Sequence, residues 1–389
     1  FSAGNSGSDR LCTHTEKIMS PERKTYTAIG VMSGSSLDGV DIALCEIKLE
    51  AQSSFEIIAA ETYKYANQEI SYIKSLLPVI TDDHHAAHTF FAEIFARHIT
   101  QFLKLFPDRQ IDFIALHGHT LLHFPAQGVS LQLGDPQLMA NILGIPVIAH
   151  FRQADIDAGG QGAPLVPMCD VIFFKQYDAC LNLGGIANIS FESASGRIGF
   201  DVCACNQLLN YCAAMAGLDY DPEGELAAAG MIDQDLLDQL NAVPYLDMPW
   251  PKSLDNHFVH RAFIDTIAKS TIPLNDKLAT AVEHIAIAIA AVIIAQPERR
   301  PLHQYQLLVT GGGAYNTFLI ERIAANAGIK ITLPGDKIIQ YKEALAMALM
   351  GALRIQSKPN FLQSVTGAKT AVSGGVIAYP EKIIAPLPS

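Results

Sequence analysis

Three glycine-rich segments, each following an apolar stretch, have the composition of turns that hold phosphate groups. Their sequences are SGSSLDGVD at 33–41, LGGIAN at 183–188 and VTGGGAYN at 309–316. Small residues let the backbone approach a ligand, and successive N–H groups can donate to phosphate oxygens. The first segment adds three hydroxyl donors, Ser33, Ser35 and Ser36. That segment alone fits a plain hairpin turn equally well, but three such turns together favour a nucleotide as the ligand.

Carboxylates in and between these turns could complete a site for phosphoryl transfer. Asp38 and Asp41 lie in the first turn and could hold a hydrated Mg²⁺, which bridges phosphates in most such reactions. Asp201 ends an apolar stretch, RIGF at 197–200, where a carboxylate can serve as a general base. A surface or helix-capping aspartate is the other interpretation of Asp201. Glu343 opens a helical pattern, and the helix dipole alone favours an acid there.

Other polar residues allow further kinds of site. The segment DAGGQGAPLVP (157–167) has a single amide side chain, Gln161, and it fits either the lining of a sugar pocket or a loop before a core helix. Histidines gather in two clusters: His84, His85 and His88, and His117, His119 and His123. These clusters, like Cys203 and Cys205, lack partner ligands at the spacing of a metal site. Ordinary hydrogen-bonded or buried side chains therefore explain them better.

Charge and cysteine content exclude several classes of protein. The chain has 389 residues, with 27 basic and 39 acidic side chains and a net charge of −12. This excess of acid argues against a general nucleic-acid binder and against docking on an anionic membrane. The 7 cysteines form no Cys-x-x-Cys pair, which fits reduced thiols in a cytoplasm. The longest apolar run, 285–295, is shorter than the roughly 20 residues of a membrane span.

Absent motifs narrow the choice further. The sequence has no GxxxxGK[ST] phosphate loop, no GxGxxG dinucleotide turn, no GxSxG nucleophile turn and no HExxH metal motif. A nucleotide would therefore be held by the glycine turns described above.

Hydrophobic periodicity predicts the elements that position these groups. Two strands at 27–33 and 40–48 are expected to form a hairpin at Asp38-Gly39, and 88–106 is expected to be an amphipathic helix. Further strands are expected at 111–116, 145–149, 180–193 (interrupted by a glycine turn), 197–202, 305–310 and 329–333. Further helices are expected at 136–143, 206–216, 257–269, 276–296, 315–327 and 343–357. Each half opens with a strand–turn–strand unit, and the alternation that follows indicates a mixed α/β protein.

Segments along nearly the whole chain resemble the anhydro-N-acetylmuramic acid kinase family. They are GVMSGSSLDGVD (30–41), LHGHT (116–120), LQLGDPQLMA (131–140), FRQADIDAGGQGAPLVP (151–167), LNLGGIANIS (181–190), GFD (199–201), VTGGGAYN (309–316), EALAMA (343–348) and SVTGA (364–368). The first segment and AGGQGAPLVP are the most specific, and the order and spacing also match.

The resemblance implies a fold and its domains. The family belongs to the sugar-kinase, chaperone-ATPase and actin superfamily, so we expect an α/β protein with two RNase-H-like (actin-like ATPase) domains and a nucleotide and substrate cleft between them. Residues 1–25 are expected to be a disordered leader or an artificial remnant. The N-terminal domain is expected to span 26–172 plus 368–389, and the C-terminal domain 173–367.

The resemblance also implies an activity: an ATP- and Mg²⁺-dependent sugar kinase. Such an enzyme opens 1,6-anhydro-N-acetylmuramic acid with water and phosphorylates the freed 6-oxygen, giving N-acetylmuramic acid 6-phosphate and ADP in peptidoglycan recycling. We expect a cytoplasmic homodimer that acts on a small amino sugar and binds neither nucleic acid nor membrane. Two alternatives stay open: a kinase for an ordinary amino sugar, and an ATP-binding regulator without turnover.

Site residues carry over position by position. Asp201 corresponds to the catalytic base. The expected ATP-binding residues are Gly34, Ser35, Ser36, Leu37, Asp38, Gly39, Val40, Asp41, Gly184, Gly185, Gly311, Gly312, Gly313 and Asn316. The expected substrate residues are His117, Arg152, Gln161, Gly162, Asn188 and Glu343. Asp38 and Asp41 are expected to hold Mg²⁺ through water.

Two departures from the family pattern affect the sugar site. The family commonly continues GFD with Thr-Gly-Pro-Gly-Asn, whereas this chain has Val202-Cys203-Ala204-Cys205-Asn206. Leu122 stands where a substrate-facing arginine is usual, so Arg152 is a candidate substitute contact for the lactyl carboxylate. We expect these changes to alter substrate affinity before they abolish the chemistry.

Overall fold

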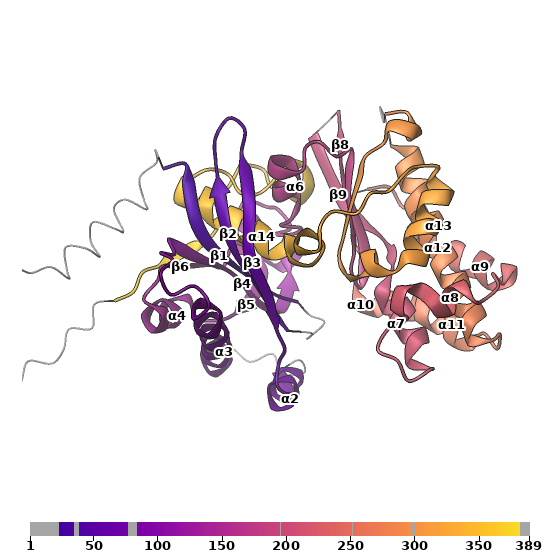
Figure 1. Cartoon of the computed structure of the whole chain (residues 1–389), viewed down its shortest axis with the longest axis horizontal. Coiled ribbons are helices and arrows are strands. Elements are labelled where there is room, and N and C mark those ends of the chain that lie inside the picture. Colours follow the sequence, from indigo (N-terminus) through magenta and orange to yellow (C-terminus); the bar gives the residue numbers. More distant parts are fainter. Residues whose placement is uncertain are drawn as a thin grey trace, which may run out of the picture. The chain divides into compact units, whose positions relative to one another are not determined.

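The chain folds into two compact units, each built on its own β-sheet. The computed structural model describes residues 23–34, 39–76, 84–194, 196–250, 252–296 and 300–381. Unit 1 comprises Phe1–Phe173 and Tyr341–Ser389, and unit 2 comprises Phe174–Gln340 (Figure 1).

Unit 1 holds a seven-stranded sheet in the order β11-β6-β4-β1-β2-β3, with β5 paired to β4. Its strands are β1 (Thr25–Ser33), β2 (Val40–Lys48), β3 (Ser54–Tyr63), β4 (Phe113–Phe124), β5 (Val129–Leu133), β6 (Val147–Ala149) and β11 (Val376–Ala378). Its helices are α2 (Asn67–Leu76), α3 (His85–Leu103), η1 (Pro125–Gln127), α4 (Pro136–Leu143), α5 (Arg152–Asp157), α6 (Pro167–Phe173) and α15 (Gln363–Thr366). To these is added α14 (Asp336–Ile355), from its non-helical residue Tyr341 onward.

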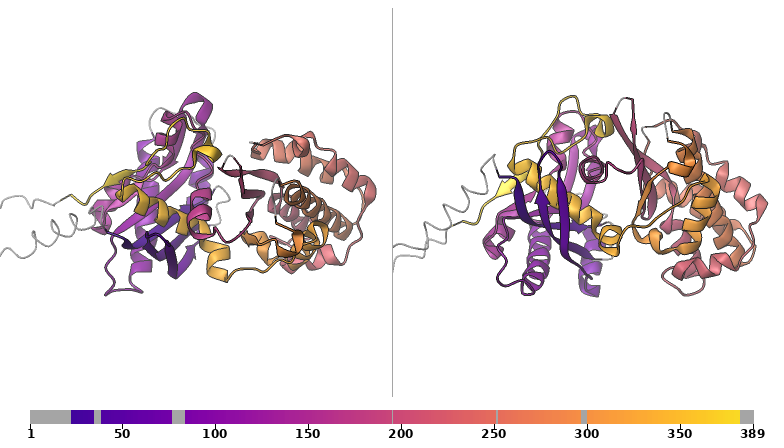
Figure 2. Two further views of the ribbon diagram at one scale, coloured as in Figure 1. Left: turned by 90° about the horizontal axis from the view of Figure 1, so that it is seen from above. Right: turned by 45° about the horizontal axis from the view of Figure 1, so that its top comes forward.

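Strand alternation explains how the sheet of unit 1 is covered on both faces. Neighbouring residues of a strand point to opposite faces, and β1 buries the large Ile29 and Val31 in the core that contains α3. Between them, Gly30 meets α14, where an added Cβ would clash with the carbonyl oxygen of Ala344. The indigo strands accordingly lie between the yellow α14 and the purple α3 (Figure 2). The large residues thus fill one face, while the missing side chain lets α14 approach the other.

Unit 2 holds a four-stranded sheet in the order β10-β7-β8-β9. Its strands are β7 (Ala179–Leu183), β8 (Ile186–Ser193), β9 (Gly196–Ala204) and β10 (Leu307–Thr310). Its longer helices are α7 (Asn206–Ala214), α9 (Gln234–Asn241), α12 (Leu274–Ala295) and α13 (Thr317–Ala327). Short helices are η2 (Pro222–Gly224), α8 (Glu225–Ala228), η3 (Pro244–Asp247), α10 (Asn256–Val259), the π-turn η4 (His260–Ile264), α11 (Asp265–Lys269), η5 (Leu302–Gln304) and η6 (Gly312–Tyr315).

The two sheets share one topology. In each, the first three strands form an antiparallel meander, and the fourth runs parallel beside the first: β3-β2-β1-β4 in unit 1 and β9-β8-β7-β10 in unit 2. This is the RNase-H-like arrangement, so the expected α/β fold with two such units is confirmed.

Helix α12 forms the centre of the unit 2 core. It is long and apolar enough to cross a membrane by length and composition, but 67% of its apolar window is buried inside the unit. Its residues Leu278, Val282, Ile285 and Ile289 are completely buried among the strands and α13. The helix therefore has the surroundings expected of a core helix.

Several elements agree with the sequence-based expectations, and one does not. The hairpins β1–β2 and β7–β8 and the helix α4 lie where turn chemistry and periodicity predict them. The expected strand at 329–333 is wrong, because these residues form no strand and the sheet edge at β10 is not extended. Strand β4 continues to Phe124, well past the expected 116, and this extension carries His117 and His119 into the sheet.

The limits of the units also differ from the expected boundaries. The chain returns to unit 1 at Tyr341, not at 368, because α14 packs on β1 through Gly30 and Ala344. At the other end, β1 begins at Thr25, and the Arg23 guanidinium pairs with the buried Asp112. Residues 23–25 are thus part of unit 1 and not of a leader.

Replacing Gly30 by alanine should destabilise unit 1. The new Cβ would overlap the Ala344 carbonyl group, and overpacking of this kind costs about 1–3 kcal/mol. Chemical denaturation of G30A should show this loss. The control G335A has no atom within 4 Å of the new Cβ and should unfold like the parent protein; equal stability of both variants would contradict the close approach.

Candidate functional site

The first glycine turn joins β1 to β2 in unit 1. Ser35, Ser36, Leu37 and Asp38 lie outside the described residues, whereas Gly34, Gly39, Val40 and Asp41 are described. Val40 pairs with Ser33 at the base of the hairpin. A Cβ on Gly39 would lie 2.6 Å from the Tyr63 carbonyl oxygen, so β3 requires glycine at this position. Asp41 follows on β2 and accepts a hydrogen bond of 2.6 Å from Thr62 Oγ1.

Ser33 is not available to a phosphate group, contrary to the interpretation of its hydroxyl as a donor. Its side chain is 2% exposed, and its Oγ lies 2.7 Å from Tyr65 Oη and 3.1 Å from His119 Nδ1. The His119 ring stacks on Phe91, and burial lowers the pKa of His119 to about 4. This buried network lies at the end of β1, beside the first glycine turn. No pattern in the sequence predicted it.

His117 and Arg152 form one hydrogen-bonded pair. Arg152 donates from Nη2 to His117 Nε2 (2.8 Å) and from Nη1 to the Gly162 carbonyl oxygen (2.6 Å). A guanidinium can only donate, so His117 Nε2 is an acceptor and its Nδ1–H donates to the Gly118 carbonyl oxygen at 2.8 Å. Burial and the charge of Arg152 lower the pKa of His117 to about 3. His117 is therefore neutral and has a fixed tautomer.

The His117–Arg152 pair joins three of the predicted substrate residues, whereas Gln161, a fourth, is not part of this group. His117, Arg152 and Gly162 are in direct contact, and no described residue accepts a hydrogen bond from the buried Arg152 Nε. The side chain of Gln161 is exposed, and its backbone N–H donates to the Thr366 carbonyl oxygen.

A buried carboxylate shapes the glycine-rich loop. Asp155, with 0% exposure, accepts from the Gly162 N–H and from Thr366 Oγ1, each at 2.8 Å. A Cβ on Gly160 would clash with the same carboxylate. Thus Asp155, which the motif comparison did not single out, holds both this loop and α15 in place.

Glu343 lies in the first turn of the part of α14 (Asp336–Ile355) that follows its non-helical residue Tyr341. The expectation of an acid in the first turn of a helix therefore agrees with the structure, although a further helical part, 336–340, precedes the kink. Glu343 is half-buried. Burial and the negative charge of Asp41 raise its pKa, while Lys342 and Arg152 oppose the rise. Asp41, Arg152 and Glu343 are thus close enough in unit 1 to influence one another.

In unit 2 the second and third glycine turns lie against each other. A Cβ on Gly311 would lie 2.5 Å from Asn182 Oδ1 and 2.9 Å from the Leu183 backbone, and one on Gly313 would lie 2.7 Å from Leu183 Cβ. Asn206 joins the same group, since its Nδ2 donates to the Leu183 carbonyl oxygen at 2.9 Å. Both glycines are therefore required by this packing.

The helix next to the second turn has no free N-terminus. The carbonyl oxygens of Gly184 and Gly185 accept from the backbone N–H groups of Cys205, Asn206 and Gln207. After the third turn, where Gly312 is exposed, the side chain of Asn316 caps α13 by accepting from the Leu319 N–H at 2.9 Å. The Asn316 oxygen is therefore already used by the helix.

Four polar residues stand in register across the unit 2 sheet. Thr310, Asn182, Asn188 and Asp201 are successive partners on β10, β7, β8 and β9. Directly paired residues share a face, so Asn188 and Asp201 lie side by side. Asp201 Oδ2 accepts from the Leu254 N–H at 2.9 Å, and no described residue donates to Oδ1. Burial raises the pKa of Asp201, and the Leu254 bond partly offsets this.

Across the described ranges, no group of three or more His, Cys, Asp or Glu side chains could hold a metal ion. His123 bonds to Ser130, and the buried thiols of Cys203 and Cys205 have raised pKa values, so they stay protonated. Within what is described, Asp41 thus remains the candidate carboxylate for a cation.

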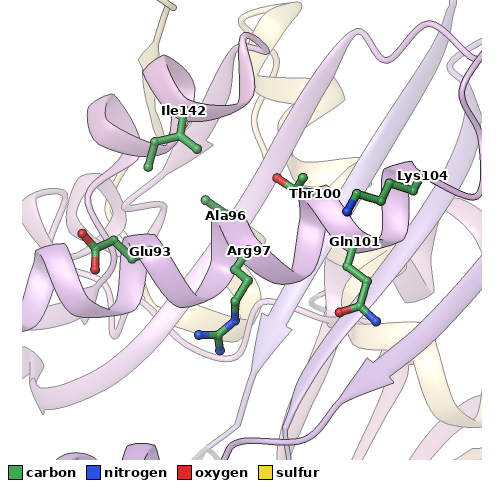
Figure 3. Close-up of a pocket in the computed structure, with 7 residues that line it drawn as sticks. All are labelled: Glu93, Ala96, Arg97, Thr100, Gln101, Lys104 and Ile142. Carbon is green, nitrogen blue, oxygen red and sulfur yellow. The ribbon is translucent and has the colours of Figure 1, made fainter.

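A surface groove of about 420 Å³ runs along α3. It is lined by Glu93, Ala96, Arg97, Thr100, Gln101 and Lys104, with Ile142 of α4 (Figure 3). None of the predicted site residues is among them, so the groove is separate from the groups described above.

Comparison with known proteins gives a consistent result. The family model described as anhydro-N-acetylmuramic acid kinase matches residues 26–380. The chain is 33% identical over 370 residues to the anhydro-N-acetylmuramic acid kinase of Saccharophagus degradans, covering 90% of this chain and 98% of that one. With the enzyme of that name from Vibrio cholerae the identity is 33% over 380 residues, covering 92% and 100%. For Haemophilus influenzae it is 34% over 376 residues, covering 90% and 97%.

Replacing Asp155 by alanine should destabilise unit 1 by about 2–4 kcal/mol, because two buried donors lose their acceptor. The control is D157A on the same helix, where the exposed carboxylate bonds only to Gln153 among the described partners. Chemical denaturation should show a large loss for D155A and nearly none for D157A. Equal effects would show that Asp155 does not hold the loop.

Proposed function

The chain belongs to the anhydro-N-acetylmuramic acid kinase family, and from that premise we propose its reaction. The protein opens the anhydro bridge of 1,6-anhydro-N-acetylmuramic acid with water and transfers the γ-phosphoryl group of ATP to the freed 6-oxygen. The products are N-acetylmuramic acid 6-phosphate and ADP, and the role is recycling of cell-wall sugars in the cytoplasm. The protein acts as a homodimer on this small amino sugar. It binds neither nucleic acid nor membrane.

The environment of Asp201 carries this proposal. One carboxylate oxygen is held by the Leu254 N–H, and the other has no donor among the described residues. Burial raises its pKa above that of a free aspartate, which brings a carboxylate closer to the basicity that a general base needs near neutral pH. These properties suit a base that takes a proton from water.

The bonds change in a balanced sequence. Asp201 removes a proton from a water molecule whose oxygen attacks the anomeric carbon. The bond from that carbon to the 6-oxygen breaks, and the 6-oxygen attacks the γ-phosphorus. The bond from the γ-phosphorus to the bridging oxygen of ADP then breaks, and Asp201 later releases its proton to solvent. Positioning and electrostatic stabilisation contribute most of the catalysis in such transfers.

The glycine turns serve the nucleotide. We assign phosphate binding to the first turn (Gly34, Ser35, Ser36, Leu37, Asp38, Gly39, Val40 and Asp41) and ATP contacts to Gly184, Gly185, Gly311, Gly312 and Gly313. These turns offer backbone donors, which suit phosphate in an acidic protein. Asn316 contributes by fixing the start of α13 after the third turn, since its side chain caps that helix.

Mg²⁺ fits beside Asp41. Burial and the charge of this carboxylate raise the pKa of Glu343, and a cation bound at Asp41 would oppose the second of these influences. Asp41, together with Asp38, would hold the ion through water, and the ion when bound would neutralise charge on the phosphates.

The sugar side of the site centres on Arg152. Leu122, in place of the usual family arginine, cannot bind the lactyl carboxylate, whereas Arg152 Nε–H has no acceptor among the described residues. We assign the carboxylate to this donor, because guanidinium groups bind carboxylates well. Hydroxyl and amide groups of the sugar are assigned to His117, Gln161, Gly162, Asn188 and Glu343.

Mass spectrometry of the product tests the whole reaction. With ATP and 1,6-anhydro-N-acetylmuramic acid, the product should be heavier than the substrate by one phosphoryl group and one water. N-acetylglucosamine serves as the ordinary-sugar control and should stay unmodified. Gain of phosphate without water would exclude the hydrolytic step, and nucleotide binding without any phosphorylated sugar would indicate a regulator instead.

Replacement of Asp201 by asparagine should lower turnover by at least about 10²-fold, the scale of a lost general base. ATP affinity should stay within twofold of the parent value, because the glycine turns are unchanged. Steady-state kinetics and calorimetric ATP titration measure the two effects. The control D219N removes an exposed carboxylate of unit 2; near-normal turnover of D201N would refute the assignment.

A further inference from the structure

The strand that carries Asp201 is an edge strand, and another segment covers its open side at that residue. Among the described strands, β9 pairs only with β8 in the unit 2 sheet. Residues 245–250 and 252–254, here called the strap, contact Asp201 at three atoms. Tyr245 Oη donates to the Asp201 carbonyl oxygen (2.7 Å), the Asp201 N–H donates to the Lys252 carbonyl oxygen (3.3 Å), and the Leu254 N–H donates to Oδ2 (2.9 Å).

The strap contacts both faces of β9. Asp201 and its neighbour Phe200 point to opposite faces, because side chains alternate along a strand. On the Phe200 face, Trp250 stacks on the Phe200 ring with centroids 5.6 Å apart and an interplanar angle of 11°. On the Asp201 face, Leu254 reaches the carboxylate. The strap therefore contacts β9 on both faces at its edge, at Phe200 through Trp250 and at Asp201 through Leu254.

The Lys252 side chain joins the two ends of the strap by hydrogen bonds. Its ammonium group donates to the carbonyl oxygens of Tyr245 (3.0 Å) and Leu246 (2.9 Å) within η3. The same group lies 4.6 Å from the centre of the Tyr245 ring. One cation thus ties together the two ends of the segment that contact Asp201.

From these contacts we infer that the strap positions the Asp201 carboxylate and sets its basicity, with Lys252 as the positioning residue and the Leu254 N–H as the donor. The inference rests on the proposed role of Asp201 as the base. It assigns a task to residues outside the glycine turns.

The backbone beside Asp201 explains why such support is needed. The register between β8 and β9 skips Val202, since Ala187 pairs with Cys203 while Asn188 pairs with Asp201. A bulge of this kind re-aims the neighbouring side chain and loosens the ladder. Here it occurs where the family commonly has Thr-Gly-Pro-Gly, in a stretch without glycine. The strap restores backbone hydrogen bonds to Asp201 on the side that β8 does not reach.

Few titratable groups face Asp201. Among the described residues, those whose pKa values Asp201 influences are Cys203 on β9, whose raised pKa keeps it neutral, and Tyr245 on the strap. Paired with it on β8 is Asn188, which does not titrate. The direct influences on the pKa of Asp201 are burial, which raises it, and the Leu254 N–H, which lowers it. Removing that N–H should therefore raise the pKa.

The first test compares L254P with L254A. Both lose the leucine side chain, but only proline removes the N–H. The pKa of Asp201, followed by carboxyl carbon NMR, and the acid limb of the kcat/KM profile should both rise by roughly one unit in L254P. L254A should keep the parent acid limb. If L254P and L254A show the same Asp201 pKa, the inference is overturned.

The two readouts separate this inference from the proposed function. A rise of the NMR pKa in L254P with an unmoved acid limb of the kcat/KM profile would support the role of the strap and refute Asp201 as the base.

If L254P does not fold, variants of Lys252 test the inference instead. K252M should lower kcat about tenfold with the KM for ATP unchanged, K252R should restore most of kcat, and the exposed control K269M should match the parent. Full kcat in K252M would overturn the inference.

Discussion

Strand register in the two sheets is the constraint on which the site depends. A slip of one residue would move every side chain of a strand to the opposite face, so Asp201 would leave the row that contains Asn188 and Asn182. Register in unit 1 likewise places Gly30 under α14 and Ile29 in the opposite core. The first two glycine turns join the strands of the hairpins β1–β2 and β7–β8, which hold this register. In the third turn, the close contacts of Gly311 and Gly313 with Leu183 leave no room for a side chain at either position.

Burial adjusts the chemistry of the polar groups that the sheets bring together. His117 lies beside a guanidinium in a buried position, so it is a neutral acceptor, while burial raises the pKa values of Asp201 and Glu343. The costs of burying these groups are offset by hydrogen bonds, as for Asp155 with its two donors. The unit 1 groups suit recognition of an anionic sugar, and Asp201 in unit 2 suits proton removal. The unit 1 groups and Asp201 differ in their hydrogen-bond and charge partners. Residue type does not explain the difference, since carboxylates occur in both units.

The departure from the family pattern after Asp201 is balanced by structure elsewhere. Without glycines, β9 continues as a strand to Ala204 and bulges at Val202. Cys203, Ala204 and Cys205 are buried in the core of unit 2, so these residues contribute packing. Asn206, which the chain retains, still links the second glycine turn to the start of α7. Beside this bulge, the strap contacts Asp201 through hydrogen bonds at three atoms.

Local patterns in the sequence determined the two glycine hairpins, the helix α4, the α/β class and the family, because turn chemistry and periodicity act between near neighbours. Patterns of the same kind misplaced a strand at 329–333 and assigned the Ser33 hydroxyl to phosphate, since neither reports which distant residue competes for the same group. Tertiary structure alone decided the partners: Leu254 is 53 positions from Asp201, Arg152 is 35 from His117, and Thr366 is 211 from Asp155. Hydrogen bonds and burial over such separations set tautomer and pKa, and they exist only when the chain is folded.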